Sequence, residues 1–253
     1  MILGIDPIDD PEEYNAFLRI VRSIGTDDYT LDDIMSAVRA SFDDNVRRIG
    51  LRIENTGAAE QSIWAGASEP VLEALGDDWR MLVADVGSLG SAREASIASA
   101  ALLGFLWEAR HAREPILIVI DEAHNVCPQN PVDENQALAT ELVVRIAGEG
   151  RKFGLYLLLS TQRPSKVHRN VISQCDNLLL MKMNSAADIE SLAETFSYAP
   201  ASLVARASSF GLGEGLAAGK LAPDPLLFQS GRRLTREGGS DVPATWATGP
   251  DAG

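Results

Sequence analysis

The chain has 253 residues, of which 45% are hydrophobic and 23% charged, as is usual for a globular protein with its own core. Its formal net charge of −14 argues against a protein that coats nucleic acid with its outer surface. No apolar run approaches the roughly 18 residues that span a membrane, no secretory signal is visible, and the two cysteines fit no metal spacing, so we expect a cytoplasmic protein without a membrane partner.

The first part of the chain is predicted to be helical. Apolar side chains at helical spacing indicate a helix from Glu12 to Ile24. Thr30 and Asp33 have the spacing of a capping box at the start of a second helix, which we expect to end near Ser41. Residues 43–65 are weakly patterned and leave room for one more helix.

Strands and helices alternate from about residue 80 onwards. The predicted strands cover residues 80–85, 116–120, 155–159, 177–183 and 225–230. The predicted helices cover residues 92–112, 133–149, 170–174 and 185–195, with a short one near Pro200. Because such alternation is typical of parallel strands joined by right-handed crossovers, we predict a layered α/β fold with a mainly parallel central sheet over residues 79–231. Residues 210–220 are expected to be a hairpin turn, and residues 232–253 a disordered tail.

The stretch from Ile116 to His124 carries the strongest chemical signal. An apolar run, mostly β-branched, is followed directly by Asp121 and Glu122, which predicts a buried strand with two carboxylates at its carboxyl end. Open α/β sheets bind ligands at that edge. The pair suits a magnesium nucleotide, with Asp121 holding the water shell of Mg²⁺ and Glu122 polarising an attacking water. An acidic pair that only caps the following turn is the alternative.

A second polar group follows the predicted strand over residues 155–159, which ends in Ser160, Thr161 and Gln162. Because the carboxyl ends of parallel strands lie at one edge of a sheet, we expect Gln162 near Asp121. There its amide would hydrogen-bond a terminal phosphate or the attacking water. A glutamine that only satisfies loop backbone is the alternative.

Gly150-Arg-Lys-Phe-Gly154 connects a predicted helix to a predicted strand. A guanidinium such as that of Arg151 suits bidentate contact with a phosphate. This connection lies at the edge opposite to the carboxylates, so Arg151 would reach the nucleotide of a neighbour in a ring more easily than its own. Simple packing of the loop is the alternative.

Four segments together resemble the HerA branch of the HerA–FtsK superfamily of RecA-like motor ATPases. They are residues 116–128, 149–154, 160–165 and 173–177, and the similarity is clearest from about residue 80 to 230. The resemblance implies a hexameric ring that hydrolyses ATP with Mg²⁺ and pumps double-stranded DNA through its pore, often beside a nuclease partner.

The resemblance also implies roles for individual residues. Asp121 and Glu122 match the Walker B acids, which makes Asp121 the metal ligand and Glu122 a catalytic residue. Gln162 matches the polar sensor. Arg151 falls where the family places its trans-acting arginine, with Lys152 as the substitute in nucleotide contact.

Basic residues are concentrated in residues 143–182, although the chain as a whole is acidic. This concentration indicates that anions are handled at one place, with an ordinary solvated helix face as the alternative. Lys166, Arg169 and Lys182 are the candidates for contacts with DNA phosphates.

The sequence departs from the family at the phosphate loop. It contains no Gly-x-x-x-x-Gly-Lys-Ser/Thr, and the nearest fragment, Gly219-Lys220, is followed by Leu221. The family has this loop before the position where the chain begins, and residues 1–78 fit the helical insertion that follows it. We therefore expect the carboxyl-terminal part of a motor domain, whether truncated, split or a relic, which binds ATP weakly and turns over negligibly on its own.

Three other functions are compatible with some of these features. The first is a non-hydrolysing, ATPase-like scaffold subunit, which the missing loop favours. The second is a fragment of a type IV secretion ATPase, which shares the fold and the glutamine. The third is a DExH helicase, because residues 121–124 read Asp-Glu-Ala-His; the Ser-Thr-Gln at 160–162 disfavours it, since such helicases have Ser-Ala-Thr.

Overall fold

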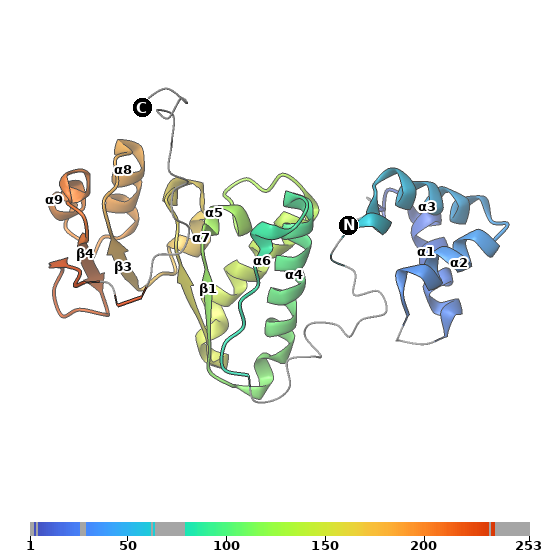
Figure 1. The fold of residues 1–253 in the computed structure, drawn as a ribbon, viewed down its shortest axis with the longest axis horizontal. Helices are drawn as coiled ribbons and strands as arrows, with labels where there is room; N and C mark the ends of the chain where they lie inside the picture. The colour runs from blue at the N-terminus through green and yellow to red at the C-terminus, as the bar shows by residue number, and fades with distance from the viewer. Residues whose placement is uncertain are drawn as a thin grey trace, which may run out of the picture. The chain divides into compact units, whose positions relative to one another are not determined.

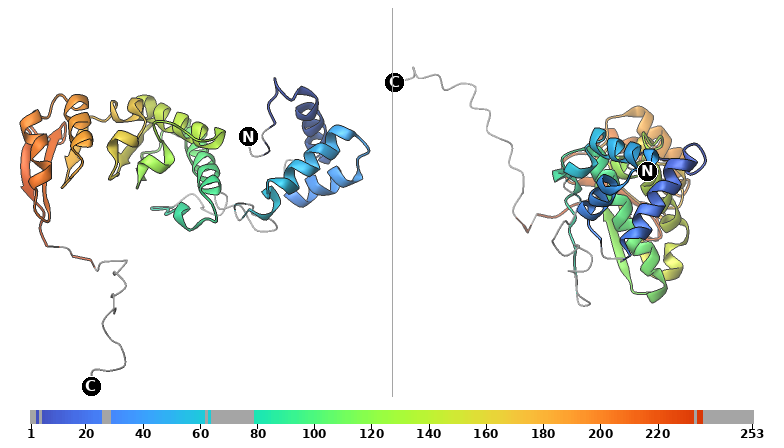
Figure 2. Two further views of the ribbon diagram at one scale, coloured as in Figure 1. Left: turned by 90° about the horizontal axis from the view of Figure 1, so that it is seen from above. Right: turned by 90° about the vertical axis from the view of Figure 1, so that its right-hand side faces the viewer.

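A computed structural model describes residues 3, 5–25, 29–61, 63, 79–232 and 234–235 (Figures 1 and 2). The chain divides into one unit of residues 1–175 and a second of residues 176–253. Nearly all of the predicted disordered tail, residues 232–253, lies outside the described residues. Within the described part of the chain, no helix combines the length and the apolar character needed to cross a membrane.

Amphipathic helices form the first part of unit one: α1 (Pro11–Ile24), α2 (Leu31–Ala40) and α3 (Asp44–Asn55), in blue in Figure 1. The predicted capping box is confirmed at α2, where the Thr30 side chain accepts from the Asp33 N–H at 3.3 Å and the Asp33 carboxylate accepts from the Thr30 N–H at 2.8 Å. A short helix, η1 (Ala58–Glu60), follows. The apolar faces meet in a small core that includes Ala16, Ile20, Val38, Val46, Ile49 and Ile53.

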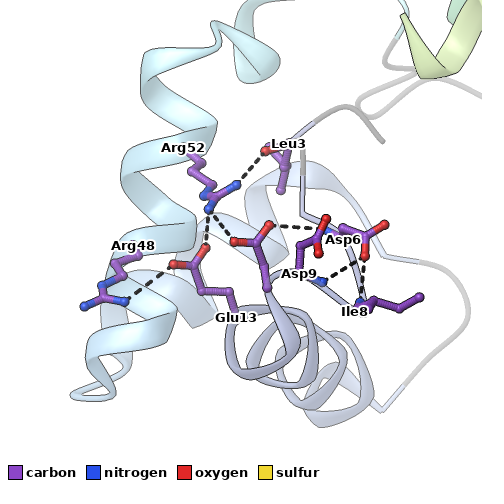
Figure 3. Close-up of polar contacts among 8 residues, drawn as sticks. Leu3, Asp6, Ile8, Asp9, Glu13, Arg48 and Arg52 are labelled. Carbon is purple, nitrogen blue, oxygen red and sulfur yellow. Dashed lines mark hydrogen bonds and ion pairs between the residues drawn. The ribbon is translucent and has the colours of Figure 1, made fainter.

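Arg52 on α3 connects this helix to α1 and to the residues that precede α1 (Figure 3). Its Nη2 lies 2.9 Å from Glu13 Oε2 and 3.2 Å from Asp10 Oδ1, and its Nη1 donates to the Leu3 carbonyl at 3.5 Å. Arg48 reaches the other oxygen of Glu13 at 3.7 Å. Glu13 is buried to 9% exposure, so the two arginines supply the charge that its carboxylate needs away from water.

A parallel strand pair with helices on one face forms the second part of unit one. β1 (Ile116–Ile120) pairs with β2 (Leu155–Leu159) in the predicted positions, with Ile116 opposite Leu155 and Ile120 opposite Leu159. Helices α4 (Ala92–Glu108) and α6 (Glu134–Glu149) pack on each other and share a core with the strands. The predicted α/β class and the parallel pairing are therefore confirmed.

The other face of this strand pair is apolar and open. Side chains alternate between the two faces of a strand, so Leu117 and Val119 of β1 share this face with Tyr156 and Leu158 of β2. Their exposed fractions are between 47% and 63%. Parallel sheets are normally covered on both faces, so this surface resembles one half of a layered core.

The predicted strand over residues 80–85 is wrong. These residues carry no strand in the structure, and Met81 and Val83 are 81% and 76% exposed. Strand backbone needs a neighbour for its N–H and C=O groups, and no strand in the described ranges pairs with this segment. The short η2 (Val86–Ser88) and the capping Ser91 then lead into α4.

Unit two contains an antiparallel sheet in the order β3 (Asn177–Leu180), β4 (Glu214–Gly219), β5 (Leu226–Gln229). The predicted strands at 177 and 225 are confirmed, but the predicted turn over residues 210–220 is largely strand β4. Its small residues serve packing: a Cβ on Gly215 would lie 2.6 Å from Phe228 Cζ. The mainly parallel character holds for unit one only. Unit two also contains the helices α8 (Ala186–Thr195), α9 (Ala201–Val204) and η6 (Ala205–Ser209).

We predict that Arg52→Ala destabilises the helical cluster by about 1–3 kcal/mol, because Glu13 would remain buried without its closest cation. Native-state hydrogen exchange of the α1 and α3 amides measures this as faster local opening. Arg47→Ala, an exposed position on the same helix, is the control. Equal exchange rates in the two variants would show that the Arg52 ion pairs contribute nothing.

Candidate functional site

The register of β1 and β2 brings the two predicted polar tips to one edge. Ile120 lies opposite Leu159, so the residues that follow each strand are neighbours. The Ser160 N–H donates to the Ile120 carbonyl at 2.9 Å, and the Ala123 N–H donates to the Ser160 carbonyl at 2.9 Å. These two backbone bonds extend the pairing past the strands and hold the tips together.

Glu122 lies at the centre of a side-chain network. Its Oε1 accepts a hydrogen bond from Gln162 Nε2 at 3.0 Å, and its Oε2 lies 3.2 Å from His124 Nδ1. The same His124 nitrogen is 3.0 Å from Thr161 Oγ1. Gln162, which we expected near Asp121, thus contacts the adjacent Glu122 directly. Together with His124 it orients the Glu122 carboxylate from both sides.

The backbone at Glu122 is unusual. Its φ is +46°, in the left-handed region that side chains other than glycine rarely adopt, and it begins the short helix α5 (Ala123–Val126). Such a conformation costs about 1–3 kcal/mol and persists only where the surroundings impose it. Here the imposed turn directs the Glu122 side chain towards β2.

Asp121 is the more accessible of the two acids. Its side chain is exposed, and its Oδ1 accepts the Glu122 N–H at 3.0 Å. Mg²⁺ in nucleotide sites keeps several waters and needs only one or two protein carboxylates. An exposed carboxylate at a strand tip fits that requirement.

The loops that follow the two tips are fastened to each other. Pro128 forms an antiparallel bridge with Val167, the Gln129 N–H donates to the Lys166 carbonyl at 2.7 Å, and the Arg169 N–H donates to Gln129 Oε1 at 2.8 Å. The short helices η5 (Pro164–Lys166) and α7 (Arg169–Ile172) carry this part of the chain. Lys166 and Arg169, both exposed, therefore lie on an ordered surface at the site's edge of the sheet.

Arg151 and Lys152 lie at the opposite edge, in η4 (Gly150–Phe153), and both are exposed. β2 separates them from Gln162, and a strand of this length spans about 16 Å at the usual rise per residue. An arginine side chain on this chain is too short to bridge that distance. The remaining candidate, Lys182, is exposed and lies two residues after the end of β3 in unit two.

His124 and Thr161 were not among the predicted site residues. They contact each other and, through His124, Glu122. Both belong to polar tips that follow predicted strands. That shared position was the available signal for them.

Among known proteins, residues 73–183 match the model of the ATPase family associated with various cellular activities (AAA). The chain is 31% identical over 127 residues to the DNA double-strand break repair helicase HerA of Sulfurisphaera tokodaii, an alignment that covers 50% of this chain and 25% of the relative. It is 35% identical over 115 residues to HerA of Saccharolobus solfataricus, covering 46% and 22%. The chain thus spans about a quarter of the length of the curated relatives it matches.

Among solved structures, VirB4 of Thermoanaerobacter pseudethanolicus superimposes with a TM-score of 0.60 at 14% identity. The match covers 91% of this chain and 66% of that one. At this identity the likeness concerns the fold alone, and it agrees with a layered α/β architecture that contains a parallel strand pair.

Cys127, which follows α5, allows a test of whether the loop of residues 127–129 is tightly packed. Burial raises the pKa of its thiol to about 12, and its Sγ donates to the Ala123 carbonyl at 3.3 Å. Because the thiolate is the reacting form, we predict that a thiol reagent at pH 8 labels only Cys175 in the native chain, and Cys127 only after unfolding. Cys175→Ser should abolish native labelling; rapid labelling of that variant would contradict the packing of the loop.

Proposed function

We propose that this chain belongs to the HerA branch of P-loop ATPases and forms part of the ATP-binding wall of a DNA-translocating motor, on the basis of its similarity to the AAA family and to HerA helicases. The observation that supports this most directly is the contact between Glu122 and Gln162 at 3.0 Å across the tips of β1 and β2. It brings an acid and an amide to the edge where α/β sheets bind ligands.

In this proposal each side chain at the edge acts on the terminal phosphate of ATP. Bound Mg²⁺ would neutralise charge on the phosphates, and Asp121 would hold it through the metal's water shell. Glu122 would accept a hydrogen bond from the attacking water and orient it. Gln162, which contacts Glu122 from the neighbouring strand, would link the state of the phosphate to that carboxylate.

The phosphate-binding loop has to come from polypeptide other than residues 1–253, because the sequence lacks the motif. We propose that this polypeptide, in the same or another chain, covers the open apolar face of β1 and β2. The exposed Leu117, Val119, Tyr156 and Leu158 support this, since a parallel sheet is stable with both faces covered.

We propose assembly into a ring of like subunits, a hexamer by analogy with the family, and the two-edge arrangement supports this proposal. Arg151 is too far from its own Glu122 to assist hydrolysis there, but a head-to-tail neighbour would present it to the adjacent nucleotide. Lys152 would be the substitute. Lys166, Arg169 and Lys182 are the proposed contacts with DNA phosphates, and a nuclease would be a further partner.

A non-hydrolysing scaffold subunit is the second candidate, which the missing phosphate loop favours. The two candidates differ in one measurable property. A motor subunit hydrolyses ATP once a phosphate loop is supplied, whereas a scaffold does not.

The decisive substitution is Glu122→Gln in an assembly that contains this chain together with a phosphate loop. The amide keeps an acceptor for Gln162 but cannot act as a base, so we expect kcat for ATP to fall at least about 100-fold. Nucleotide affinity should change by less than about threefold. Glu141→Gln, an exposed acid on α6, is the control. Unchanged turnover in Glu122→Gln would exclude the proposed role, and an assembly in which the unaltered chain is inactive would favour the scaffold.

Arg151→Ala should reduce ATP hydrolysis in the assembled ring by about 1,000-fold or more, as expected for a transition-state arginine. Mixing this variant with Glu122→Gln subunits should restore part of the activity, because some interfaces then combine an intact Glu122 with an intact Arg151 of the neighbour. ATPase rates across a series of mixing ratios measure this. A strictly additive series would mean that Arg151 does not act across the interface.

A further inference from the structure

We propose that Phe153 is a positioning residue that anchors η4 and thereby fixes Arg151 in the place from which it contacts a neighbour's nucleotide. This inference rests on the proposed function, since it takes the trans-acting role of Arg151 as given. It concerns the regulation of that role by the side chain two residues further on.

The Phe153 ring is held by two other rings at the end of α4. Its centroid lies 5.9 Å from that of Trp107 and 5.6 Å from that of His111, with interplanar angles of 79° and 80°. These are edge-to-face arrangements, which attract the rings to one another beyond the burial of area. Trp107 itself is 9% exposed and belongs to the core beneath β1 and β2.

The Arg110 guanidinium packs on the rings of Trp107 and Phe153. Its guanidinium carbon lies 4.5 Å from the Trp107 ring centroid and 5.6 Å from that of Phe153, and its Nη1 donates to the Trp107 carbonyl at 2.6 Å. A cation over aromatic faces adds a further attraction at each contact. Phe153 is therefore held by α4 and η3 (Ala109–Ala112), elements distant in sequence from η4.

Glycines at both ends of η4 allow its backbone to approach the neighbouring backbone closely. A Cβ on Gly150 would lie 2.8 Å from the Leu155 carbonyl oxygen. Gly154 has a φ of +88°, and a Cβ there would lie 3.0 Å from the Glu114 carbonyl oxygen. The Gly154 carbonyl also accepts the Ile116 N–H at 3.0 Å, which joins the end of the loop to the start of β1.

Phe153 lies between these two glycines, and it carries the only large apolar side chain of Gly150-Arg-Lys-Phe-Gly154. Arg151 and Lys152 extend outwards and are exposed. A charged group acts on a transition state most effectively when its position is set before the reaction, and a misplacement of about 1 Å can cost up to 100-fold in rate. Removing the ring should therefore loosen η4 without changing the contact between Glu122 and Gln162 in the same subunit.

The first measurement is hydrogen exchange of the amides of residues 151–154 in the full chain. Phe153→Ala should accelerate their exchange at least about tenfold, while amides in the middle of α6 keep their rates. Phe153→Tyr, which retains the ring, should behave like the unaltered chain. Phe105→Ala, at an exposed phenylalanine of α4, is the matched control. Equal exchange in Phe153→Ala and Phe105→Ala would overturn the proposal, whether or not any assembly hydrolyses ATP.

The second measurement is ATP hydrolysis by the assembly that contains a phosphate loop. Phe153→Ala should lower kcat about tenfold or more with KM changed by less than about twofold, and Phe153→Tyr should restore kcat. Full activity of Phe153→Ala beside an inactive Arg151→Ala would overturn the anchoring role and leave the proposed function intact. Full activity of Arg151→Ala would overturn both.

Discussion

The parallel pairing of β1 with β2 is the constraint on which the candidate site depends. With Ile120 opposite Leu159, the residues after both strands meet at one edge, and Glu122 contacts Gln162 at 3.0 Å. A shift of the register by one residue would turn the buried face of a strand towards solvent. The core formed with α4 and α6 therefore excludes that shift, and burial of Ile120 and Leu155 beneath the sheet determines where the polar tips lie. The paired strands and their core also impose the left-handed backbone conformation at Glu122.

The same strands also separate two kinds of chemistry. The acidic and amide side chains lie at the carboxyl ends, whereas Arg151 lies at the amino end of β2. Each edge is fastened by its own contacts: the loop of residues 127–129 pairs with residues 166–169 at one edge, and the rings around Phe153 hold the other. A rigid strand pair with different chemistry at its two ends is suited to head-to-tail association, in which each copy would complete a site on the next.

Local sequence was sufficient for some features and insufficient for others. Residues 116–120 and 155–159 were predicted at their observed bounds because uninterrupted apolar runs end in polar clusters, and the Thr30–Asp33 capping box is local by nature. The strand over residues 80–85 was predicted on the same apolar signal, but a strand also requires a partner, which local sequence does not specify. β4 was missed because Gly215 and its small neighbours suggest a turn until Phe228 is known to pack on them. The contacts of His124 depend on side-chain orientation, which spacing alone does not determine.

The open face of β1 and β2 has a practical consequence for handling the chain on its own. Leu117, Val119, Tyr156 and Leu158 form a contiguous apolar surface of the kind that soluble monomers rarely display. In dilute buffer such a surface favours non-specific self-association, and chaperones would recognise it during expression. Detergent, a fusion partner or co-expression with the polypeptide proposed to cover this face should each improve the yield of dispersed protein.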